Sequence, residues 1–226
     1  MNSHQKKKSS RFQRFWHGLY LILLLVVFVG AYLVYSSAHG NFRGVVPGKV
    51  YRSAQPSPEQ LREWTGRYGF KTVINLRGDE TEEVKAERAV AEDLGLKMVT
   101  MTLSSYRLSA RYLIVELLKT LESVETPVLI HCHSGIDRAG TASALAAMVI
   151  GQVHYEKAKW QAYVAPGPWK RKKYKNRRYF RDYSHISDVL RLYERHCGKN
   201  NLQTNDWQQL KRWIAETDEL PEVEPR

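Results

Sequence analysis

The stretch PVLIHCHSGIDRAGTASALAAMVIG, residues 127–151, decides the fold of this chain. It begins with a short apolar run at 127–130 that is typical of a buried strand. It ends with a run rich in small residues at 138–151, which favours a closely packed helix. The loop between them runs from Cys132 to Arg138. A strand, a tight loop and a helix in this order bring several backbone N–H groups to one point at a helix N-terminus, which predicts an anion-binding site.

Strands and helices alternate along the chain before this stretch, and further helices follow it. Ser57, Pro58 and Gln60 provide an N-cap, a first-turn proline and a capping box, so they predict the start of a helix. The other predicted elements are strands at 49–52, 71–77 and 96–103, and helices at 81–96, from Ser109 onward, at 187–196 and at 205–216. This alternation predicts an α/β fold with a mostly parallel central sheet flanked by helices. Ligands of such sheets bind where the chain leaves the carboxyl ends of the strands, which is the position of Cys132.

The loop carries the residue types that phosphate chemistry needs. Gly135 allows a tight turn, and the planar guanidinium of Arg138 can bind two phosphate oxygens at once. Helix N-termini and nearby cations favour the ionised form of a cysteine, so we expect Cys132 to be a thiolate that accepts a phosphoryl group. A lone cysteine is more often an inert buried side chain. Here its neighbours Gly135 and Arg138 favour the nucleophile.

Three motifs carry a family resemblance. His131 and Cys132, followed by five residues and Arg138, resemble the signature of cysteine-dependent protein tyrosine and dual-specificity phosphatases. The motifs VYRSAQPS at 50–57 and VINLRG at 73–78 resemble the opening of the compact, atypical dual-specificity group that is common in bacteria. The resemblance covers about residues 43–165, and it implies a dual-specificity phosphatase-like fold.

The resemblance also implies a mechanism, which is hydrolysis of a phosphomonoester in two steps through a cysteinyl-phosphate. It implies that Cys132 is the nucleophile, that Arg138 binds phosphate and that an acid protonates the leaving oxygen. The remaining site residues that we expect are phosphate-binding His133, Ser134, Gly135, Ile136 and Ala139, and supporting His131 and Thr141.

The sequence departs from the usual family pattern at two positions. The general acid usually lies on a loop some thirty residues before the cysteine, yet residues 97–112 contain no Asp or Glu. Asp137 is the nearest replacement, because the like charge of a bound phosphate favours the protonated form of a neighbouring carboxyl group. The alternatives are Asp79, Glu80, water, or a leaving group that needs no acid. Ala139 occupies a position where many relatives have a hydroxyl, for which Ser134 or Thr141 could substitute, unless the second step is slow.

No metal or cofactor is expected. His131 and His133, separated by one cysteine, do not have the spacing of a familiar zinc site, and the chain has no C-x-x-C pair. Cys132 and Cys197 are the two cysteines of the chain, which is too few for a disulfide framework.

Charge and hydropathy divide the remainder of the chain. The formal net charge of +12 is concentrated in two basic segments without acids, residues 1–14 and 170–181. The almost wholly apolar run at 19–35 is long enough to cross a bilayer, which needs roughly 17 to 25 residues. A signal peptide cleaved after the small residues Ser36 and Ala38 is the alternative, but its apolar core would be shorter, about 7 to 15 residues.

These segments predict the following organisation. Residues 1–18 form a basic cytoplasmic N-terminus, 19–36 a transmembrane helix, 43–165 the phosphatase domain, and 166–226 a basic segment with C-terminal helices. The phosphatase domain is then periplasmic in a bacterial inner membrane, although Arg43, Lys49 and Arg52 follow the span closely and weaken this orientation.

The basic segment 170–181 has three interpretations. It is a solvated face, a contact for anionic lipid head groups, or a nucleic-acid contact, which we expect least. The substrate classes compatible with the loop are phosphotyrosine or phosphoprotein, anionic phospholipid and inositol phosphate, and a membrane anchor favours a substrate at the membrane. The alternative function is a catalytically inactive, membrane-anchored phosphate-binding module.

Overall fold

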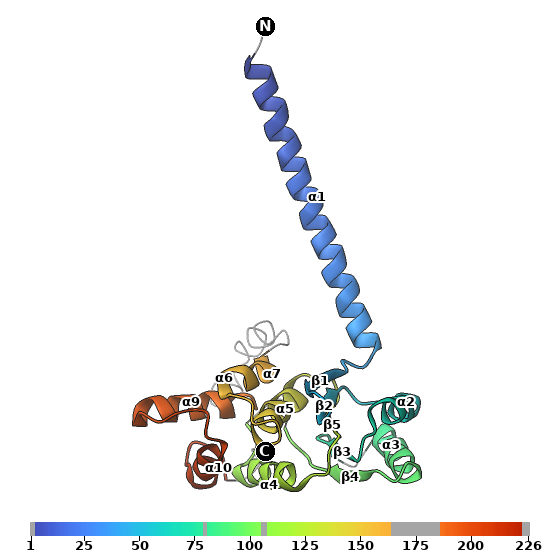
Figure 1. Cartoon of the computed structure of the whole chain (residues 1–226), viewed down its shortest axis with the longest axis vertical. Helices are drawn as coiled ribbons and strands as arrows, with labels where there is room; N and C mark the ends of the chain where they lie inside the picture. The colour runs from blue at the N-terminus through green and yellow to red at the C-terminus, as the bar shows by residue number, and fades with distance from the viewer. Residues whose placement is uncertain (1–2, 79–80, 105–107, 164–185, 223–226) are drawn as a thin grey trace. The chain divides into compact units, whose positions relative to one another are not determined.

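The computed structural model describes residues 3–78, 81–104, 108–163 and 186–222. The chain divides into two compact units, Met1–His39 and Gly40–Arg226. The first unit is a single helix, α1 (Ser3–Ala38), drawn in blue in Figure 1. Its segment Phe15–Tyr32 has a mean hydropathy of 2.0, with 0% of it buried, so it is long and apolar enough to span a membrane. A signal sequence near an N-terminus has the same properties.

The second unit is built around a five-stranded sheet with the order β1-β2-β5-β3-β4. Its strands are β1 (Arg43–Val46), β2 (Val50–Ser53), β3 (Thr72–Asn75), β4 (Lys97–Thr100) and β5 (Val128–His131). β2, β5, β3 and β4 are mutually parallel, which confirms the predicted mostly parallel sheet, and β1 is an antiparallel edge strand. We did not predict β1. Its pairing shifts register between Gly44 and Val46, and so short an irregular strand lacks a readable alternation of apolar residues.

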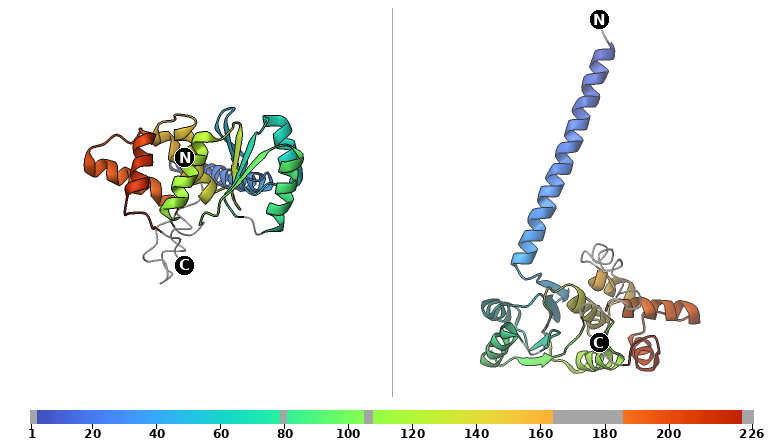
Figure 2. Two further views of the ribbon diagram at one scale, coloured as in Figure 1. Left: turned by 90° about the horizontal axis from the view of Figure 1, so that it is seen from below. Right: turned by 180° about the vertical axis from the view of Figure 1, so that it is seen from behind.

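Helices cover both faces of the sheet, as the predicted α/β class requires. One face is covered by α2 (Pro58–Tyr68) and α3 (Glu82–Asp93), and the other by α4 (Arg111–Ser123) and α5 (Asp137–Val149) (Figure 2). The remaining described helices are α6 (Tyr155–Ala158), α7 (Trp160–Tyr163), α9 (Asp188–Asn200) and α10 (Trp207–Glu216). Among these, α7 packs on α5 and α10 packs on α4.

Local signals place the first helices as the sequence predicted. The Ser57 hydroxyl accepts a hydrogen bond from the Gln60 amide, and the Gln60 side chain accepts one from the Ser57 amide, which completes the capping box of α2. Gly69 ends this helix in the left-handed conformation at φ 66°. Thr81 caps α3 through Val84, and acidic residues occupy the first turn of that helix.

The core is divided by the sheet into two layers. The larger layer lies under α4 and α5 and continues to α9 and α10, whereas the smaller layer lies under α2 and α3. Ten consecutive residues of α5, from Ala139 to Met148, are buried. Such complete burial requires small side chains, because the helix contacts the sheet and other helices on several sides. At Gly140 an added Cβ would lie 2.7 Å from the carbonyl oxygen of Gln161 in α7.

Candidate active site

The site lies at the carboxyl edge of the sheet. β5 ends at His131, which is in register with Ser53 of β2 and Asn75 of β3. The His131 carbonyl accepts a hydrogen bond of 3.0 Å from the Leu76 amide just beyond β3. Cys132 is the next residue, so three parallel strands end around it, as expected for the ligand site of such a sheet.

The loop from Cys132 to Ile136 turns at Gly135. Gly135 has a φ of +68°, and a Cβ at this position would lie 2.5 Å from the backbone nitrogen of Ala54. Only glycine fits this close approach, as the sequence predicted. α5 begins at Asp137, and its capping residue Ile136 makes no side-chain hydrogen bond to the first turn. The N-terminus of the helix thus receives no acceptor from its own cap, which suits an anionic ligand.

Arg138 is held in place through one of its guanidinium nitrogens. Its Nη1 atom donates hydrogen bonds to the carbonyl oxygens of Leu76, at 3.1 Å, and Leu103, at 3.3 Å. Its Nε atom is buried and has no hydrogen-bond partner. A buried donor without a partner is unfavourable unless a ligand supplies an acceptor. The fixed Nη1 and the open Nε together fit the binding of a phosphate oxygen.

Cys132 is a free thiol that is only 2% exposed. Cys197 of α9 is also free and buried, so the two cysteines are not joined in this structure. The low exposure of Cys132 means that a substrate must enter the loop to reach the sulfur.

A second guanidinium, which the sequence did not predict as part of the site, interacts electrostatically with this cysteine. Arg52 of β2 is 2% exposed and is in register with Ile130 of β5. Its Nη1 atom donates to the backbone carbonyl oxygen of Gln161. Burial and the charge of Arg43 lower the pKa of Arg52 from 12.5 to about 10, whereas the charge of Cys132 raises it. Arg52 therefore stays cationic at neutral pH. In the sequence, Arg52 could be recognised as a charged residue within a strand whose other residues suit burial.

The side chain of His131 is paired with an acid that the sequence analysis also missed. Its Nε2 atom lies 2.7 Å from Oε1 of Glu87 in α3, and both side chains are at most 1% exposed. The second oxygen of Glu87 accepts a hydrogen bond of 2.8 Å from Gln55, which in turn accepts one of 2.8 Å from Arg77. This chain of contacts orients His131 directly before the nucleophile. The sequence signal for Glu87 was an acidic residue that interrupts the buried face of a predicted helix.

The other predicted site residues lie on or beside the same loop. His133 is exposed, Ser134 and Asp137 are half-buried, and Ala139 is buried in the first turn of α5. The Thr141 hydroxyl donates to the carbonyl oxygen of Asp137 at 3.0 Å. The alternative acids at positions 79 and 80, and the basic segment 170–181, lie outside the described residues.

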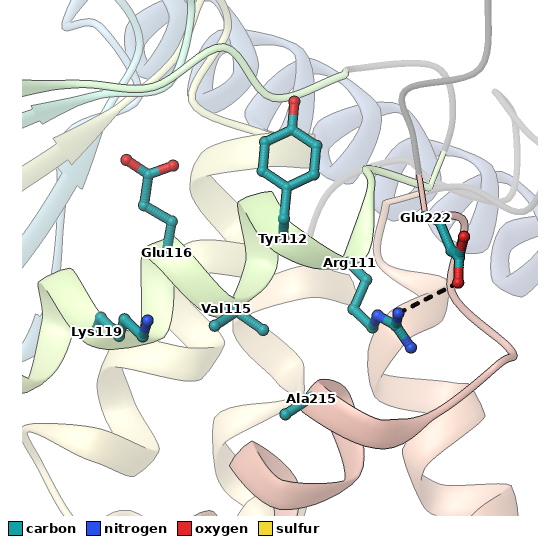
Figure 3. Close-up of a pocket in the computed structure, with 7 residues that line it drawn as sticks. All are labelled: Arg111, Tyr112, Val115, Glu116, Lys119, Ala215 and Glu222. Carbon is teal, nitrogen blue, oxygen red and sulfur yellow. Dashed lines mark hydrogen bonds and ion pairs between the residues drawn. The ribbon is translucent and has the colours of Figure 1, made fainter.

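A separate pocket lies between α4 and the C-terminal part of the chain (Figure 3). It is lined by Arg111, Tyr112 and other α4 residues together with Ala215 and Glu222, and an ion pair of 3.4 Å joins Arg111 to Glu222. None of its lining residues belongs to the cysteine loop, so we do not assign the chemistry to it. Within the described part of the chain, no three His, Cys, Asp or Glu side chains are grouped so that they could hold a metal ion.

A cysteine and an arginine at the two ends of an anion-binding loop, between a central parallel strand and a helix, define a cysteine-based phosphatase. The family model described as "DSP-PTPase phosphatase fused to NAD+ Kinase" matches residues 36–174, and the chain belongs to this family. No curated protein matches the chain.

Two solved structures illustrate what the chain is similar to. The core catalytic domain of the PP-IP phosphatase SIW14 from S. cerevisiae is 20% identical, with a TM-score of 0.50 over 71% of this chain and 93% of that chain. TpbA from P. aeruginosa is 20% identical, with a TM-score of 0.43 over 75% of this chain and 88% of that chain. At 20% identity, the likeness to SIW14 shows a common fold.

Proposed function

We propose that the protein hydrolyses phosphomonoesters, with Cys132 as the nucleophile, Arg138 as the phosphate-binding residue and Asp137 as the general acid. The observation that carries the proposal is the geometry of Arg138, whose Nη1 atom is tied to two carbonyls while its buried Nε atom has no partner. This arrangement supports a site that is preorganised for an oxyanion.

In the first step, the sulfur of Cys132 forms a bond to phosphorus while the bond from phosphorus to the leaving oxygen breaks. Asp137 donates its proton to that oxygen. In the second step, water attacks phosphorus, the bond from sulfur to phosphorus breaks, and the Asp137 carboxylate accepts the proton of the water. Inorganic phosphate and the thiolate are the products. The loop amides and Arg138 stabilise the three equatorial oxygens in both transition states.

The proposed substrates are phosphotyrosine or phosphoprotein, an anionic phospholipid, or an inositol phosphate. The similarity to SIW14, which is a PP-IP phosphatase, supports a substrate of the inositol phosphate class. We further propose that α1 remains as a single membrane anchor and that the catalytic unit is periplasmic. The basic residues before the apolar segment support this orientation, because positive charge is retained on the cytoplasmic side.

Turnover of p-nitrophenyl phosphate by the full chain in detergent tests the proposal. Cys132→Ser should abolish activity, whereas Cys197→Ser, which removes the other buried free thiol, should leave it intact. No activity in either protein would support an inactive phosphate-binding module in place of the enzyme. Equal activity in the wild type and Cys132→Ser would show that turnover does not depend on Cys132 and would contradict its role as the nucleophile.

The role of Asp137 is tested with leaving groups of different basicity. Asp137→Asn should slow hydrolysis of phenyl phosphate by about 10²-fold, because the phenolate needs a proton to depart. Hydrolysis of p-nitrophenyl phosphate should be affected less. An equal loss with both substrates would assign the general acid elsewhere.

A further inference from the structure

A loop that binds an anion with main-chain amides must direct its carbonyl groups away from the anion. In a trans peptide the carbonyl of one residue and the N–H of the next point in opposite directions. The Ser134–Gly135 peptide is trans, since the one cis peptide among the described residues is Thr126–Pro127. Whatever holds the Ser134 carbonyl on one side of the loop therefore directs the Gly135 N–H to the other side.

Two carbonyls of the cysteine loop have donors from outside the loop. The His133 carbonyl accepts from the backbone amide of Gln55 at 3.3 Å. The Ser134 carbonyl accepts from the side-chain Nδ2 of Asn41 at 2.8 Å. The first donor is main chain and is independent of side-chain identity. The second depends on an asparagine that lies 93 residues earlier in the sequence.

The backbone around Asn41 is itself fixed against the loop. Asn41 has a φ of +50°, in the left-handed region that asparagine tolerates better than most residues. The carbonyl of the preceding Gly40 accepts a hydrogen bond of 2.6 Å from the amide of Ala54. This same Ala54 nitrogen is the atom that an added Cβ at Gly135 would approach to 2.5 Å. The segment after β2 thus lies against both Gly40 and the turn of the cysteine loop.

We propose that Asn41 is a positioning residue for the phosphate loop: its amide holds the Ser134 carbonyl outward and so directs the Gly135 N–H toward the bound phosphate. This inference rests on the proposed phosphatase function. Position 41 requires both a left-handed backbone and a hydrogen-bond donor. Glycine supplies only the backbone conformation, and an aspartate carboxylate supplies only an acceptor. Asn41 is the second residue of the catalytic unit, so the start of this unit forms part of the active-site scaffold.

Glycine substitution separates the hydrogen bond from the backbone conformation. We would compare Asn41→Gly with Asn201→Gly in the full chain in detergent, because Asn201 has nearly the same backbone conformation, φ +53°, at the exposed end of α9. Asn41→Gly should lower kcat/KM for p-nitrophenyl phosphate and raise the inhibition constant of orthovanadate, each about tenfold, which is the usual effect of one lost hydrogen bond. Asn201→Gly should change neither. Asn41→Asp should lose at least as much as Asn41→Gly, because a carboxylate would face the Ser134 carbonyl.

Two results would overturn the proposal. One is an Asn41→Gly variant whose kcat/KM and orthovanadate inhibition constant both lie within about twofold of the wild type. The other is a loss of activity that accompanies a lower unfolding temperature while the orthovanadate inhibition constant is unchanged, since a merely structural role predicts that pattern. Failure of the underlying function is recognised separately, because the wild type would then show no turnover that depends on Cys132.

Discussion

At the scale of single residues, the site contains two guanidinium groups with different environments. Arg138 has one nitrogen fixed by the carbonyls of Leu76 and Leu103 and one buried nitrogen without a partner. Arg52 is almost fully buried and also has an Nε atom without a partner, but its Nη1 atom donates to the Gln161 carbonyl and its charge interacts with Cys132. We propose that the first binds the substrate and that the second stabilises the thiolate of Cys132.

Arg138→Lys should not be a conservative change. A lysine ammonium cannot bind the two carbonyls and a phosphate oxygen with the same planar geometry, so we expect kcat/KM to fall by about 10²- to 10³-fold. Steady-state kinetics with p-nitrophenyl phosphate would measure the loss. Arg62→Lys, in an exposed ion pair with Asp93, is the matched control and should have normal activity. Retention of more than a third of the wild-type kcat/KM by Arg138→Lys would contradict the assigned role.

Arg52→Gln should make the Cys132 sulfur harder to ionise. Since the positive charge of Arg52 attracts the thiolate, its removal should shift the pH at which iodoacetamide inactivates the enzyme half-maximally to a higher value. The pH dependence of the inactivation rate measures this directly. An unchanged or lower midpoint would show that Arg52 acts through its contact with Gln161 alone.

Glu87→Ala should destabilise the catalytic unit because it leaves His131 buried without its partner. Removing the partner of a buried polar group costs about 1 to 3 kcal/mol in the free energy of unfolding. Urea denaturation followed by tryptophan fluorescence would measure the change. Glu92→Ala, on the exposed side of the same helix, should have little effect. Equal stability of the two variants would mean that the buried pair contributes little.

At the scale of elements, the turn of the loop depends on how closely β2 and the start of α5 approach each other. Gly135 and Gly69 have similar backbone conformations, with φ of +68° and +66°, but only Gly135 lies against another backbone segment. Gly69→Ala should therefore cost about 1 kcal/mol through conformation alone. Gly135→Ala should in addition displace the loop and abolish turnover. Thermal unfolding and kinetics of both variants test this, and an active Gly135→Ala variant would refute it.

The sequence predicted some helices and strands and missed others. Helix α2 was predicted because Ser57 begins a capping box, and α3 because acidic residues occupy its first turn. Such local signals involve residues only a few positions apart. β5 and α5 were predicted because an apolar run and a small-residue run border a loop with a recognisable motif. β1 was missed because an irregular edge strand is stabilised by its pairing with β2 and not by its own pattern.

At the scale of the whole molecule, the helix Ser3–Ala38 is a separate unit with an apolar surface that no other described residue buries. We expect it to hold the protein in the membrane. After alkaline carbonate washing the full chain should remain in the membrane pellet, and its mature N-terminus should lie before residue 38. A soluble product that begins at His39 would instead identify the apolar segment as a cleaved signal peptide.

The sequence by itself determined the α/β class, the strand that leads to Cys132, and the loop between Cys132 and Arg138. These features depend on neighbouring residues, whose spacing is written directly in the chain. Only the tertiary structure decided that Glu87 pairs with His131, that Arg52 lies near the nucleophile and that Asn41 binds the Ser134 carbonyl. Each of these contacts joins residues that are far apart in sequence. The register of the parallel strands and the packing of helices on them bring these residues together, and no local sequence pattern specifies either one.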